Sequence, residues 1–122
     1  MSATGLPVFD TTLHKTAQWL DEITEDMHWE EKQRAYHALR SVLHTLRDRL
    51  LPDEAAHLGA QLPLLVRGIY YEGWHPAHKP LRYRHKEEFM AHVAREMADA
   101  TKDELEHAVT AVFGVLSRHS DE

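Results

Sequence analysis

The sequence has no cysteine among its 122 residues. Disulfides, thiolate-bound metals and thiol nucleophiles are therefore excluded. Long apolar runs are also missing, because the longest (62–66 and 112–116) fall far short of the roughly 20 residues that cross a bilayer. The N-terminus lacks the basic and apolar segments of a secretory signal. These absences predict a soluble protein of the cytoplasm with no membrane partner.

Positive charge is in deficit, with 14 Lys and Arg against 20 Asp and Glu, which gives a net charge of -6. General affinity for nucleic acid depends on neutralising phosphates, so this balance argues against a nucleic-acid partner. Histidine is plentiful instead, at 11 residues. Histidines change charge between about pH 5 and 8. We expect most of them on exposed helix faces, and a pH-responsive association is the alternative.

The chain repeats itself at an offset of 70 residues without a gap. Residues 19–46 align with 89–116, and Met27, Lys32, His37, Ala38 and Val42 are among six identical positions. Leu46, matched by Leu116, is the sixth. The phase holds through two helices and the turn between them, so the repeat predicts two related helical hairpins.

Apolar spacing predicts an all-α fold of about five main helices. Helices are expected over about 10–27, 32–51, 52–58, 86–100 and 102–117, with Leu13 on the buried stripe of the first. The run 64–71 is apolar enough to be a further buried helix, interrupted at Gly68. Thr101 with Glu104 three residues later is a typical capping box for the last helix.

The predicted domain organisation is a tandem-repeat bundle in a single helical domain, residues 9–122, after a flexible tail at 1–8. The first copy covers 9–74 and carries a short third helix and an aromatic segment. A connector covers 75–85, and a second copy, truncated after its helical hairpin, covers 86–122. The two hairpins are expected to share one four-helix core.

A mixed polar and aromatic segment closes the first copy. Its candidate binding residues are Arg67, Tyr70, Tyr71, Glu72 and Trp74. A glutamate beside a histidine could form a general acid–base pair if burial moved its pKa toward neutrality. The alternative is that Tyr70 and Trp74 pack against the repeat interface with their polar tips in water.

Three histidines follow in the connector. His75, His78 and His85 could offer three imidazole nitrogens to a divalent metal such as zinc, leaving the open position typical of a catalytic site. The spacing lies on a proline-containing loop and is not the helical HExxH signature. We therefore expect no cofactor, and the metal site is the alternative.

A basic stripe is predicted on the second helix, opposite its leucines. His37, Arg40, His44 and Arg47 recur at helical spacing. Such a stripe could meet an acidic partner, a phosphate ligand or an RNA backbone, but a solvated helix face is the expectation for charges at this spacing.

Residues 35–74, AYHALRSVLHTLRDRLLPDEAAHLGAQLPLLVRGIYYEGW, resemble a family of small bacterial proteins catalogued as domain of unknown function 2267. The resemblance covers essentially the whole chain, from FDTTLHKTAQWL onward. It implies an all-helical tandem fold and a bacterial cytoplasm, and it carries over no catalytic residue. The second copy departs from the family pattern, since no second QLP-like segment follows Arg118.

The functional expectation is a non-enzymatic interaction or oligomerisation module. It would contact a protein partner or a second copy through the region 70–78 and leftover apolar surface, including Phe113 and Leu116. The alternative is a small metal- or small-molecule-dependent enzyme centred on Glu72 and the loop histidines.

Overall fold

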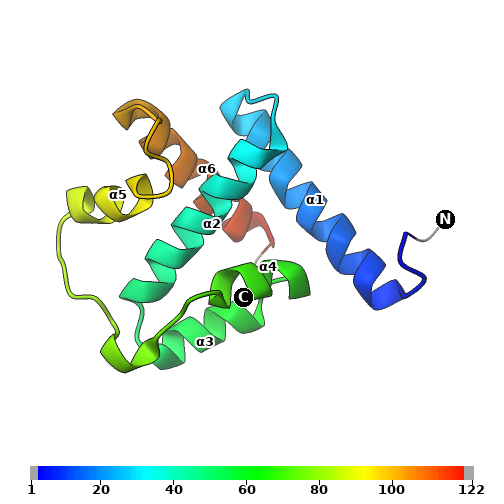
Figure 1. Ribbon diagram of the computed structural model, residues 1–122, viewed down its shortest axis with the longest axis horizontal. Helices are drawn as coiled ribbons and strands as arrows, with labels where there is room; N and C mark the ends of the chain where they lie inside the picture. Colours follow the sequence, from blue (N-terminus) through cyan, green and yellow to red (C-terminus); the bar gives the residue numbers. More distant parts are fainter. Residues whose placement is uncertain (1–2, 120–122) are drawn as a thin grey trace.

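The computed structural model describes residues 3–119, and these residues form an all-α fold with no strand (Figure 1). The predicted all-α class is therefore confirmed, although six helices are described where about five main ones were expected. The described elements are α1 (Pro7–Met27), α2 (Lys32–Arg49), α3 (Pro52–Ala60), α4 (Leu64–Tyr71), the 3-10 turn η1 (Pro76–His78), α5 (Lys86–Ala94) and α6 (Lys102–His119). The candidate run 64–71 is a helix that continues through Gly68.

The first helix begins earlier than predicted. Pro7 occupies its first turn, where a missing N–H is tolerated and the fixed φ suits a helix. Residues 7 and 8 therefore belong to α1 and not to the predicted tail, and the predicted start at about residue 10 is wrong. His28 ends α1 in a left-handed conformation with φ of 57°.

The junction between α5 and α6 also differs from the prediction. A helix over 86–100 was expected, but α5 ends at Ala94 and residues 95–100 form turns. The predicted capping box is confirmed, because the N–H of Glu104 donates to the Thr101 hydroxyl over 3.1 Å. In return, the N–H of Thr101 donates to the Glu104 carboxylate over 3.3 Å.

The core lies where α1, α2 and α6 pack together, with α5 against α2 and α6 and with α4 against α1 and α2. Positions related by the offset of 70 are buried in both halves. These pairs are Trp19 and Phe89, Ile23 and Val93, Met27 and Met97, Ala38 and Ala108, and Val42 and Val112. The helices of the two halves differ in length, however, since α1 has 21 residues and α5 has 9. How closely the two hairpins superpose stays a prediction.

Two apolar segments expected inside lie at the surface. Leu13 is 43% exposed, and Leu64 and Leu65 are 47% and 40% exposed. Thr12 takes the buried position on α1, where its hydroxyl accepts a 2.8 Å hydrogen bond from the N–H of Leu65. This bond satisfies one of the free N–H groups at the start of α4, so the interior side of α1 is polar here.

No helix in the part of the chain that the structure describes is long and apolar enough to cross a membrane.

Candidate functional site

The residues predicted as a binding segment are held by internal bonds. The Arg67 guanidinium donates to the carbonyls of Gly59 (2.9 Å) and Leu62 (3.0 Å) at the end of α3. Tyr70 is fully buried, and its hydroxyl donates to the Ala55 carbonyl over 2.7 Å. Burial raises the pKa of Tyr70 well above its ordinary value, so the phenol stays neutral. Both side chains fasten α4 to α3.

The two other aromatic candidates pack beside Tyr70, with Tyr71 edge-on to the Tyr70 ring and Trp74 tilted against Tyr71. The Tyr71 ring lies 4.9 Å from the Tyr70 ring and 5.5 Å from the Trp74 ring, measured between centroids. Tyr71 also covers Gly59 so closely that a Cβ there would lie 2.4 Å from the Tyr71 hydroxyl oxygen. Tyr71 and Trp74 are both half-buried, and Tyr71 is part of the α3–α4 packing.

Glu72 lies in a charged cluster that joins three elements. Its carboxylate accepts a 3.1 Å hydrogen bond from the Nε of Arg40, and Arg40 also pairs with Glu96 after α5. Glu72 is exposed, and its side chain faces α2 rather than the loop histidines. The structure thus brings Glu72 together with Arg40, and the acid–base pair with a loop histidine stays a prediction.

The predicted basic stripe is only partly solvated. Arg47 is 4% exposed, and it donates to the carbonyls of Tyr70 and Glu72 over 2.8 Å each. The interpretation of Arg47 as solvated is therefore wrong, because its guanidinium satisfies the last carbonyls of α4. His44 contributes a third such bond, since its Nε2 lies 2.6 Å from the Ile69 carbonyl oxygen.

The surroundings of His44 lower the pKa of its side chain. Burial lowers the pKa of His44, and the positive charges of Arg47 and Arg40 lower it further. The carbonyl of Ile69 and the carboxylate of Glu96, 3.7 Å from its Nδ1, act in the opposite direction but do not compensate. These surroundings favour the neutral ring, whose Nε2–H donates to the Ile69 carbonyl. A polar hollow of about 160 Å³ adjoins it, lined also by Asp48, His92 and Arg95.

The candidate metal ligands lie apart from this cluster. His75 and His85 are exposed at opposite ends of the connector, and His85 precedes α5 as its N-cap residue. Among the described side chains, no three His, Asp or Glu residues are arranged to hold a metal ion. The side chain of His78 lies outside the described part, so the metal site of His75, His78 and His85 stays a prediction.

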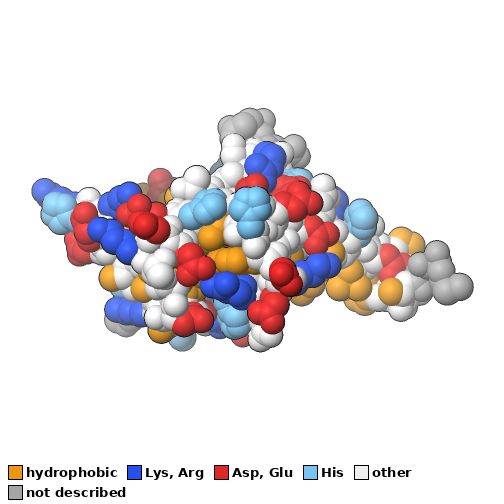
Figure 2. Space-filling model, turned by 90° about the horizontal axis from the view of Figure 1, so that it is seen from above, with side chains coloured by type: hydrophobic (Ala, Val, Ile, Leu, Met, Phe, Trp, Pro, Cys, Tyr) orange, Lys and Arg blue, Asp and Glu red, His pale blue; other side chains and the backbone are white. Residues whose placement is uncertain are grey.

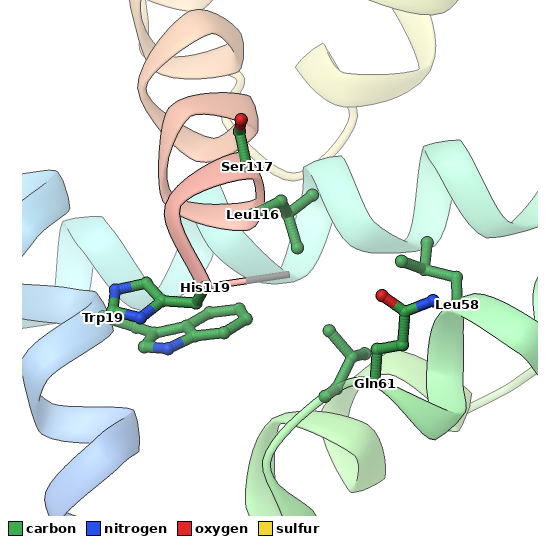
Figure 3. Close-up of a pocket in the computed structure, with 7 residues that line it drawn as sticks. Trp19, Leu58, Gln61, Leu116, Ser117 and His119 are labelled. Atoms are coloured by element: carbon green, nitrogen blue, oxygen red, sulfur yellow. The ribbon is translucent and has the colours of Figure 1, made fainter. Parts of the chain in front are cut away.

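A groove lies between α1, α3 and the end of α6 (Figure 3). It encloses about 260 Å³, with Leu116 of α6 facing Leu58 and Gln61 across it. The His119 ring stacks on Trp19 at 5.4 Å, and its Nε2 lies 2.8 Å from a carboxylate oxygen of Glu22. Leu116 is thus half-buried, whereas Phe113 is 39% exposed.

The most exposed apolar region is one that sequence reasoning missed. The structure gathers six exposed apolar side chains from the start of α1 and the start of α4, which we name the α1/α4 apolar surface: Leu6, Val8, Phe9, Leu13, Leu64 and Leu65. In Figure 2, hydrophobic side chains gather at the end of the molecule where α1 begins. Two hollows cross this surface, of about 420 and 450 Å³. A signal was present in the sequence, because α1 and the run 64–71 each have more apolar residues than one buried stripe needs.

A family model matches residues 16–122, most of the chain, and its description is "Uncharacterized conserved protein (DUF2267)". The chain belongs to the DUF2267 family. The resemblance seen in residues 35–74 is thereby confirmed. A comparison with curated proteins finds no match. In this DUF2267 protein the match begins within α1, so the first part of the α1/α4 apolar surface, Leu6 to Leu13, precedes the matched range.

Proposed function

We propose that this DUF2267 protein is a non-enzymatic interaction module of the bacterial cytoplasm that works through the α1/α4 apolar surface. The observation that carries the proposal is the exposure of this surface, where each of the six side chains is between 40% and 59% exposed. The largest contiguous apolar patch on a soluble domain is often a functional surface.

The internal use of the predicted chemical groups supports the same proposal. Arg67 and Tyr70 bind carbonyls of α3, and Arg47 binds carbonyls of α4. Glu72 pairs with Arg40. A catalytic residue needs a side chain directed at a substrate, and these groups are directed at backbone or at each other. We therefore propose the α1/α4 apolar surface as the contact patch in place of the region 70–78, which was expected from the sequence.

Photo-cross-linking in living cells tests the proposal. A photoreactive amino acid replaces Leu65 in one variant and Leu51 in a control variant. Leu51 is 52% exposed but lies between α2 and α3, away from the surface. We expect protein adducts from position 65 and none from position 51. Absence of any adduct at position 65, or equal adducts at both positions, would overturn the proposed function.

A further inference from the structure

The area, the charge and the shape of the α1/α4 apolar surface indicate which kind of partner binds it. We propose that a second copy of this chain covers it, forming a two-fold dimer in which α1 and α4 of each copy pack against α1 and α4 of the other. This inference rests on the proposed function, since it names the partner of the same surface.

The area fits one half of a dimer interface. With roughly 150–200 Å² for a fully exposed side chain of this size, six side chains at 40% to 59% exposure present on the order of 500 Å². A standard interface covers about 800 Å² per partner, of which about 56–65% is apolar. The apolar share of one partner is therefore close to what this surface offers, without a contribution from elsewhere on the molecule.

The charge of the surface also suits a copy of itself. Among the described residues, the hollow beside Phe9 is lined only by uncharged ones, and the hollow beside Val8 has Lys15 as its single charged member. Charged residues make up 28% of the whole chain, so this end is depleted. Depletion of charge is typical of an interface core. Lys15 is thus the one charge that each copy would bring to these linings, and a basic partner would find no counter-charge in them.

The shape provides both a projection and a depression, as a two-fold interface requires. In a two-fold dimer one patch meets its own copy, so it must carry the features that complement each other. Phe9 and Leu13 project from α1, at 46% and 43% exposure. Gly68 on α4 lines the adjacent hollow, and a Cβ placed there would meet no atom within 4 Å. A projecting side chain of one copy can therefore enter the depression at Gly68 of the other.

Gly68 makes a sharp test possible. It lies within α4 at an ordinary helical φ and faces open space, so a larger residue should fit in the isolated chain. The same side chain would fill the depression and block the second copy. Gly68→Arg and Leu65→Glu are the two disrupting variants, and Leu51→Glu is the control, since it alters an exposed leucine outside the surface.

Sedimentation velocity of the purified full chain gives the result. Between about 1 μM and 500 μM, a range that spans tight to weak micromolar association, we expect the wild-type mass to rise from 14.1 kDa toward twice that value. Leu51→Glu should follow the wild type. Gly68→Arg and Leu65→Glu should weaken association at least about tenfold, as substitutions at an interface centre do, while circular dichroism shows both folded.

Three outcomes would overturn the dimer. The wild type could stay at 14.1 kDa throughout, Leu51→Glu could lose association as the disrupting variants do, or both disrupting variants could associate normally. If one disrupting variant fails to fold, the other decides. The cross-linking experiment separates the two proposals. If position 65 cross-links to a different protein and the purified chain is monomeric, the dimer is contradicted. The proposed interaction module is then still supported.

Discussion

Arg47 shows how one side chain can fix the arrangement of neighbouring helices. Its guanidinium is 4% exposed and binds the carbonyls of Tyr70 and Glu72 as well as the carboxylate of Asp48 at 2.7 Å. These contacts use the planar set of donors that distinguishes arginine from lysine. The end of α4 is therefore held on α2 by a charge that the sequence pattern places on a solvated face.

Replacement of Arg47 by methionine should lower the free energy of unfolding by about 2–4 kcal/mol, because it leaves two carbonyls without donors and removes the partner of Asp48. Urea titration followed by circular dichroism measures the loss. Arg95→Met, at an exposed position after α5, is the matched control and should change stability by no more than about 0.5 kcal/mol. Equal effects of the two substitutions would contradict the assigned role.

His44 should make stability depend on pH. Burial and the charges of Arg47 and Arg40 lower its pKa in the folded chain below the unfolded value of 6.5, so protonation favours unfolding. Its contribution is complete above about pH 6.5 and is lost as the pH falls through the lowered folded pKa. His44→Gln keeps an N–H for Ile69 but does not titrate. Between about pH 7.5 and pH 5 the urea midpoint of the wild type should therefore fall more steeply than that of the variant. Parallel pH curves would exclude this role for His44.

Residue-level prediction from sequence succeeded where a local rule decides the outcome. The Thr101 and Glu104 capping box is a pattern of two residues three apart, and both of its bonds are present. It failed where a distant element decides. The buried state of Arg47 depends on α4 ending beside α2, and the exposure of Leu64 depends on how little of α1 and α4 other elements cover.

Among the elements of the candidate surface, α4 depends most on its neighbours for its position. It is 8 residues long, too short to be stable alone, and it depends on side chains from its neighbours. Thr12 of α1 satisfies its beginning, while His44 and Arg47 of α2 satisfy its end. This support fixes Val66 and Tyr70 inward and leaves Leu64 and Leu65 outward.

The cap of α6 allows a prediction at this scale. Thr101→Ala removes the hydroxyl that accepts from the N–H of Glu104 and should lower the free energy of unfolding by about 1 kcal/mol. Thermal unfolding should show a lower midpoint for this variant, whereas Thr101→Ser keeps the acceptor and should stay close to the wild type. A midpoint for Thr101→Ala equal to that of the wild type would mean that the cap adds nothing.

The apolar periodicity of the sequence predicted that the helices exist, but it did not always predict where they end. Apolar spacing continues through Met97, and Met97 is buried as that spacing predicts. The chain nevertheless leaves α5 at Ala94 and reaches Met97 through turns. Burial alone therefore did not determine the backbone path there, since a turn can place the same side chain in the core.

For the whole molecule, the central claim is that the end formed by α1 and α4 is an interface. The rest of the described chain supports this arrangement, with a core at α1, α2 and α6 and with polar side chains fastening α4 in place. The offset of 70 predicted the related core positions, but it carried no information on the segment before Trp19, which lies outside the aligned range. Much of the surface lies in that segment.

Amide hydrogen–deuterium exchange at low and high protein concentration tests this claim most directly. Raising the concentration should slow exchange in residues 7–16 and 64–68, because a second copy would cover these backbone segments. Exchange in α5 should not change, since α5 lies apart from the surface. Unchanged exchange in both ranges, or slowing confined to α5 or α6, would contradict the account.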